Sequence, residues 1–182
     1  MPHLTHSLPV HFWMRIHTQY RHQKYGKSYV PLKWSTTLKQ SAEVWANELL
    51  KSSCGSSLYH DPDNHKYGEN LASNLGTGSW GEFKSTDTIV SRFVEKEQNL
   101  AWPNNAHFTA VLWRPTKFVG CSDVAKSMGD NKTCRVQVCR YATAGNCDMS
   151  SFNNGSSNWW MNGVMQDTSR CGAECPDGGC PH

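Results

Sequence analysis

The chain of 182 residues contains eight cysteines, and this even number constrains its fold more than any other feature. The cysteines are Cys54, Cys121, Cys134, Cys139, Cys147, Cys171, Cys175 and Cys180. In an oxidising compartment such a set forms disulfides, whereas in the cytosol it more often serves metal or redox chemistry. No two of them have the C-x-x-C spacing of a zinc knuckle. We therefore expect disulfides and a secreted, extracellular protein.

The length allows one domain with a substantial core, because a chain of this size can bury about 70% of its unfolded surface. A net charge of +3 is too weak to indicate a nucleic-acid partner. No apolar run reaches the roughly 18 residues of a membrane span, so we expect no transmembrane segment and a monomer. Because nothing before Leu4 could direct translocation, we expect an exported form to begin upstream of Met1.

Three segments have the spacing of apolar residues that places side chains on one face of a helix. The first covers residues 10–23, the second follows the potential cap Trp34-Ser-Thr-Thr, and the third covers residues 86–98. The residues expected to face inward are Phe12, Ile16 and Tyr20 in the first, Leu38, Ala42, Trp45 and Leu49 in the second, and Ile89, Val90 and Phe93 in the third.

Short aromatic or β-branched runs follow at residues 108–113, 118–122 and 135–141. Turn-forming residues separate them, which predicts adjacent antiparallel strands. Alternation along the first run would turn its odd-numbered residues to one side, together with His107 just before it. The segments around Cys54 and Gly76 are predicted to be loops. Helices first and strands later indicate an α+β fold.

The chain changes in composition after Asn146, where Asn, Ser and Gly become frequent. We expect a domain at residues 8–148 and, at residues 149–182, a cysteine-containing extension packed on it, because this segment has little apolar content for a core. The extension also carries Trp159 and Trp160. Two N-glycosylation sequons occur, at Asn131 and at Asn154.

Several segments between residues 10 and 146 occur in an order that resembles a known family. They are Leu32-Lys-Trp34, Leu38, Ala42, Trp45-Ala46, Cys54, Tyr67-Gly-Glu-Asn-Leu-Ala72, His107-Phe-Thr-Ala-Val-Leu-Trp113, Gly120-Cys121 and Cys139-Arg-Tyr-Ala-Thr-Ala-Gly-Asn146. The chain resembles the CAP superfamily, which comprises cysteine-rich secretory proteins, antigen 5 of venoms and pathogenesis-related proteins. The resemblance implies an exported α-β-α sandwich, with an antiparallel sheet between helical layers.

The resemblance also implies a central cleft that holds two histidines and two glutamates. His107 matches the signature histidine and Glu69 the glutamate of the Gly-Glu-Asn turn. The other histidine is expected between the early cysteine and that turn, where His60 fits best and His65 is the alternative.

The second glutamate departs from the family pattern of an aromatic residue followed three positions later by a glutamate. Counting from Phe93, that position holds Lys96. Glu97 lies one helical turn beyond Phe93 and would share its face, whereas Glu95 fits if Arg92 takes the place of the aromatic residue. Both glutamates are therefore candidates.

Two imidazoles and two carboxylates suit a divalent cation such as zinc. We expect no catalytic residues and a protein that binds a sterol, another lipid or an extracellular protein partner, as the resemblance implies for some members. One alternative is a metal-dependent hydrolase that uses the same cleft. Another is an extracellular interaction or defence module without a small ligand, which would use the two tryptophans of the extension.

The resemblance also implies a pairing for half of the cysteines. Cys54 matches a position that pairs with Cys121 in relatives, and Cys134 would pair with Cys139. The remaining four cysteines would form two bridges, for which three pairings exist.

Overall fold

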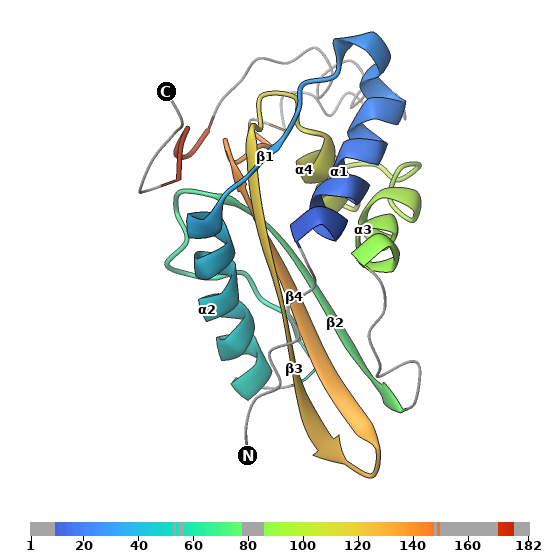
Figure 1. The fold of residues 1–182 in the computed structure, drawn as a ribbon, viewed down its shortest axis with the longest axis vertical. Coiled ribbons are helices and arrows are strands. Elements are labelled where there is room, and N and C mark those ends of the chain that lie inside the picture. Colours follow the sequence, from blue (N-terminus) through green and yellow to red (C-terminus); the bar gives the residue numbers. More distant parts are fainter. Residues whose placement is uncertain are drawn as a thin grey trace.

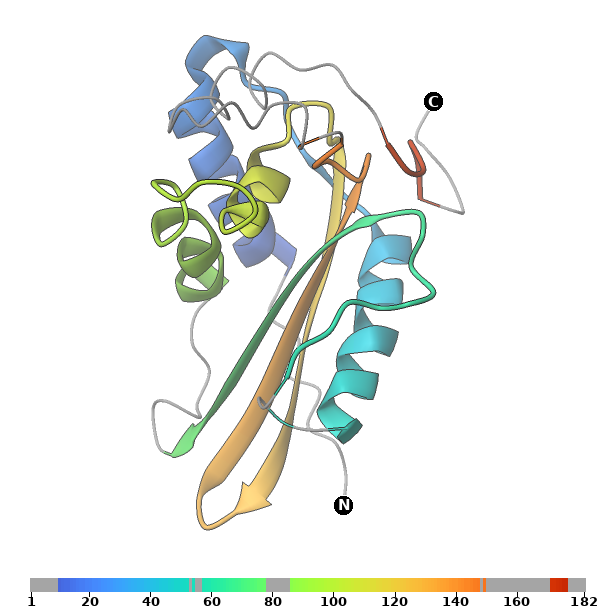
Figure 2. The same cartoon turned by 180° about the vertical axis from the view of Figure 1, so that it is seen from behind.

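A four-stranded sheet lies between two helical layers in the computed structural model of this chain (Figure 1). The structure describes residues 10–52, 54, 57–77, 86–147, 149 and 171–176. Helix α2 covers one face of the sheet, and α1, α3 and α4 gather on the other, as the reverse view also shows (Figure 2). The predicted α-β-α sandwich is confirmed.

The three predicted helices are present as α1 (Val10–Tyr25), α2 (Thr36–Ser52) and α3 (Thr86–Glu95). A short 3-10 helix, η1 (Gly26–Ser28), follows α1. Most residues expected to face inward are buried, namely Ile16, Tyr20, Leu38, Ala42, Trp45, Leu49, Ile89, Val90 and Phe93. No described helix combines the length and the apolar character needed to cross a bilayer.

A fourth helix, α4 (Ala106–Leu112), occupies most of the run that the sequence predicted as a strand. That prediction is wrong, as is the shared strand face for His107 and the odd-numbered residues after it. Every residue from Phe108 to Leu112 is buried. A helix enclosed on all sides has no polar stripe, so its sequence cannot show the helical period that separates it from a strand.

The sheet has the strand order β1-β3-β4-β2, with β1 (Lys33–Trp34), β2 (Gly68–Thr77), β3 (Phe118–Gly129) and β4 (Lys132–Ala142). Strands β3, β4 and β2 pair antiparallel, as expected, and the two-residue β1 pairs parallel with β3. Strands β3 and β4 include the predicted runs and extend beyond them. Strand β2 had no strand-like sequence pattern, because buried Asn70 and Asn74 interrupt its apolar residues.

Successive side chains of β4 point to opposite faces of the sheet. Cys134 packs with α2, whereas Cys139 belongs to the core under α1, α3 and α4. Five positions apart on one strand, these cysteines cannot reach each other. The expected Cys134–Cys139 pairing is therefore wrong, and so is Cys54–Cys121. The disulfides are Cys54–Cys134, between the end of α2 and β4, and Cys121–Cys139, between directly opposite residues of β3 and β4.

The described segment 171–176 is attached to the sandwich by covalent and hydrogen bonds. Cys147 and Cys171 form a disulfide, and the Ala173 N–H donates to the Lys66 carbonyl at 2.8 Å. Cys175 is also disulfide-bonded. The sequence predictions for Asn154, Trp159, Trp160 and Cys180 concern positions outside the described residues.

Gly120 on β3 sits where the strand crosses the start of α2. A Cβ atom built at this position would lie 2.3 Å from the Lys39 backbone nitrogen and 2.6 Å from the Ser35 carbonyl oxygen. Backbone atoms cannot move aside as a flexible side-chain end can. The close approach of sheet and helix therefore requires glycine here.

We expect Gly120→Ala to lower the free energy of unfolding by about 3 kcal/mol or more, because the added methyl group would separate α2 from β3. Gly129→Ala is the control, since its Cβ meets nothing within 4 Å and its φ of 81° costs only about 1 to 2 kcal/mol. Urea unfolding of both variants measures the difference. Equal losses would contradict the steric explanation.

Candidate functional site

His60, in the loop before β2, forms a hydrogen bond with Glu69 on that strand. Its Nδ1 lies 2.6 Å from Glu69 Oε1. The Glu69 side chain is only 4% exposed, whereas that of His60 is 71% exposed, so the carboxylate anchors an imidazole that reaches solvent. The hydrogen bond to Glu69 is the main cause of the raised pKa of His60. His65, the alternative, is exposed, and its backbone N–H bonds to the Asp63 carbonyl.

His107, in the first turn of α4, forms the equivalent pair with Glu97. Its Nδ1 lies 2.6 Å from Glu97 Oε1, and Glu97 Oε2 accepts the backbone N–H groups of His107 and Phe108 at 3.0 and 3.1 Å. The carboxylate thus satisfies two free donors at the start of the helix and orients the imidazole. The Phe93 ring stacks on His107, with the ring centroids 5.0 Å apart.

Glu97, rather than Glu95, is the glutamate that contacts a histidine. Helix α3 ends at Glu95, so Glu97 lies in the turn beyond the helix. Glu95 instead accepts the Tyr20 hydroxyl at 2.6 Å, between α3 and α1. A helical register could not decide between the two glutamates, because one of them is outside the helix.

The two pairs are connected to consecutive residues of β2. Glu69 holds His60, and next to it Asn70 donates from Nδ2 to the His107 carbonyl oxygen at 3.1 Å. In each pair the carboxylate takes the Nδ1 side of the imidazole, which leaves Nε2 to bind a cation. Among the described residues, neither pair belongs to a group of three potential metal ligands whose ligand atoms all lie within 4.8 Å of one another.

Arg140, on β4, is a residue of this site that the sequence did not identify as one. It is fully buried and lies directly opposite Glu69 in the strand register. Its Nη1 is 3.0 Å from Glu69 Oε2, and its Nη2 is 2.5 Å from Asp61 Oδ2. The guanidinium thus fixes Glu69 and compensates its charge. The resemblance included Arg140 in a signature segment, but gave it no role.

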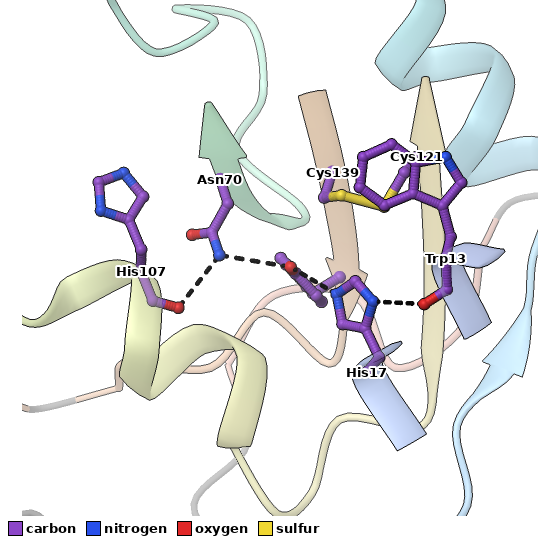
Figure 3. The surroundings of a disulfide bond; sticks show 7 residues. Trp13, His17, Asn70, His107, Cys121 and Cys139 are labelled. Carbon is purple, nitrogen blue, oxygen red and sulfur yellow. Dashed lines mark hydrogen bonds between the residues drawn. A yellow bond between two sulfur atoms is a disulfide. The ribbon is translucent and has the colours of Figure 1, made fainter. Parts of the chain in front are cut away.

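A buried chain of hydrogen bonds runs from this site to α1 (Figure 3). Asn70 Nδ2 lies 3.3 Å from the Tyr141 hydroxyl, which lies 3.0 Å from His17 Nε2. His17 Nδ1 lies 2.8 Å from the Trp13 carbonyl oxygen. A carbonyl only accepts, so Nδ1 carries the proton of a neutral imidazole. Nε2 therefore accepts the Tyr141 O–H, and Tyr141 accepts from Asn70.

His17 also has ligand atoms close to the sulfur atoms of Cys121 and Cys139, all within 4.8 Å of one another. This group is not a metal site in the oxidised protein. The two sulfurs are bonded to each other (Figure 3), so neither is a thiolate. Both nitrogens of His17 are already in hydrogen bonds.

Known proteins share this fold and this sequence pattern. The sequence model of the cysteine-rich secretory protein family, CAP, matches residues 14–141. Venom allergen 5 of Vespa mandarinia is 27% identical over 66% of the chain and 60% of its own length. The human Golgi-associated plant pathogenesis-related protein 1 is 30% identical over 76% of the chain and 85% of its own length.

Among solved structures, that of NaASP2 with Zn²⁺ has a TM-score of 0.50 and 15% identity, over 74% of this chain and 78% of that one. It shows the shared fold. The chain spans a little more than half the length of the venom allergens that it matches.

We expect the stability of the protein to depend on pH through His17. Burial, and to a smaller extent Arg21, lower the pKa of His17 to about 4, while the hydrogen bond to Trp13 acts in the opposite direction. Between pH 6.5 and 4 the unfolded chain binds a proton at His17 that the folded chain does not. Stability should therefore fall by about 3 kcal/mol as the pH drops through this interval.

Urea unfolding between pH 7 and pH 4 measures this loss. His17→Gln is the matched variant, because it keeps a polar side chain and removes the titrating group. The wild type should lose more stability on acidification than this variant. Parallel curves would contradict the assignment to His17.

Proposed function

Because the chain belongs to the cysteine-rich secretory protein (CAP) family, we propose that it is an exported binding protein that holds a divalent cation between His60 and His107. One observation carries the proposal: each imidazole has its Nδ1 on a carboxylate, 2.6 Å away in both pairs. This arrangement fixes the ring and makes the opposite nitrogen a better ligand. Zinc suits two imidazoles, and NaASP2, which has the same fold, was solved with Zn²⁺.

In this proposal Glu69 and Glu97 orient the ligands instead of binding the cation directly. Arg140 supports that role, since its ion pair with Glu69 leaves less negative charge for a cation. A bound cation would polarise a water molecule, which is the chemistry that the hydrolase alternative needs. No further observation favours turnover, so we propose a protein without catalytic residues.

The disulfides support export to an oxidising compartment. Three pairs are formed, Cys175 is also bonded, and none of the described cysteines is free. Asn131 is exposed in the turn between β3 and β4, a suitable position for glycosylation. We further propose that residues 149–182 pack on a domain formed by residues 8–148, since segment 171–176 is bonded to that domain.

We expect zinc to bind the wild type measurably and His107→Ala at least about tenfold more weakly, because one of two imidazole ligands is lost. Glu97→Gln should also weaken binding, since the carboxylate orients His107. Isothermal titration calorimetry measures the affinities. His65→Ala is the control, with an unchanged affinity expected. Equal affinity in wild type and His107→Ala would refute the site, whereas ester turnover that stops on chelation would favour the hydrolase.

The same titration should depend on pH. Protonation removes the lone pair with which an imidazole binds a metal, so affinity for zinc should fall at least about tenfold from pH 7.5 to pH 5. Because the pKa of His60 is raised, the loss of zinc affinity that is due to protonation of His60 should begin at a higher pH. Equal affinities at the two values would contradict histidine ligation.

Binding of a sterol or another lipid is a separate part of the proposal and rests on the family. Described residues line two cavities beside α3. The linings include the charged side chains of Arg92, Glu95 and Lys24. These cavities are unlike the apolar pocket that a sterol requires. We expect saturable uptake of cholesterol or a fatty acid at micromolar concentration. Competition binding with radiolabelled lipid tests this, and no saturable uptake of either class would remove it.

A further inference from the structure

Helix α3 carries a cavity of about 320 Å³ that belongs to neither histidine pair. Its lining residues are Thr88, Ser91, Arg92, Glu95 and Lys96. A second cavity, of about 410 Å³, adjoins it and is lined by Glu95 together with residues of α1. Figure 1 shows α1 and α3 side by side. The cavities therefore lie on the face of the sheet that α1, α3 and α4 cover, opposite α2.

Arg92 has an unused binding edge. Its Nε and Nη2 atoms are buried and have no hydrogen-bond partner, and no ion pair joins it to the described residues. These two atoms lie on the same edge of the planar guanidinium and carry nearly parallel N–H bonds. Such an edge binds two oxygens of one oxyanion. Burying both donors without a partner costs free energy, which a ligand at this edge would recover.

The nearby carboxylate of Glu95 forms no hydrogen bond with Arg92 Nε or Nη2. Glu95 also lines the cavity, but its Oε1 accepts the Tyr20 hydroxyl, and the Ser91 hydroxyl oxygen lies 2.9 Å from that same group. Lys96 contributes a second positive charge to the lining. Glu95 opposes an anion, yet two cations outweigh it. The lining thus combines a net positive charge with a free pair of donors.

We propose that this cavity on α3 binds a phosphate group, free or as part of a lipid headgroup, through the Nε and Nη2 edge of Arg92. A phosphate has enough oxygens to occupy that edge with two and to face Lys96 with another. A carboxylate has only the first two. The site is independent of a cation at His60 and His107.

The direct test follows the Arg92 Nε–H signal by ¹H–¹⁵N NMR during titration with inorganic phosphate. This signal should shift and saturate. Arg92→Gln should weaken phosphate binding at least about tenfold, and Arg92→Lys should weaken it too, because lysine keeps the charge but not the paired donors. Arg15→Gln removes the same charge from an exposed position on α1, and it should bind as the wild type does.

Three results would overturn the proposal: an unmoved Arg92 signal, equal affinity in Arg92→Gln and Arg15→Gln, or acetate binding as tightly as phosphate. Thermal unfolding of each variant confirms that it is folded. Sedimentation with phosphatidylcholine vesicles, with and without phosphatidic acid, separates the two sources. Arg92-dependent sedimentation with vesicles that contain phosphatidic acid indicates a lipid headgroup. Binding of inorganic phosphate by a protein that does not sediment with these vesicles indicates a free phosphate.

Discussion

The alternation of side chains along β4 determines which helical layer each of its residues contacts. The strand is paired on both sides, with β3 and β2, and its two faces contact different helical layers. Even-numbered residues face α2, which directs Cys134 to Cys54 and Arg140 to Glu69. Odd-numbered residues face α1 and α4, which directs Tyr141 to His17. Two of the disulfides, the charge of the site and the buried hydrogen bond to His17 thus share one cause.

The same alternation on β2 connects this strand to two histidines from different layers. Glu69 and Asn70 are neighbours and point to opposite faces. Glu69 holds the loop histidine on the side of α2, while Asn70 holds the backbone of His107 on the side of α4. A change of one residue in the register of β2 would exchange the two side chains and disrupt both contacts. The sheet therefore determines the site more than the loops do.

Sequence reasoning succeeded where one physical rule acted alone. Leu38, Ala42 and Trp45 predicted α2 because that helix has one buried face and one exposed face. It failed at α4, whose residues from Phe108 to Leu112 are all buried, and at the cysteines, whose pairing depends on which face of a strand each one occupies. It left Glu95 and Glu97 open, because the end of α3 between them is set by tertiary contacts. Family order found His60 and Glu69, which no local pattern could bring together.

Buried arginines show how this fold compensates charge. Arg21 is fully buried and donates to four backbone carbonyls in the last turn of α4 and just beyond it, those of Val111, Trp113, Arg114 and Thr116. Arg140 meets two carboxylates. Arg92 has neither kind of partner among the described residues, although two of its donors are buried. The first two guanidiniums have partners within the chain, although Arg21 Nε and Arg140 Nε are buried without a hydrogen bond. On the proposal above, a phosphate in the cavity that Arg92 lines would supply the partner that the described residues do not.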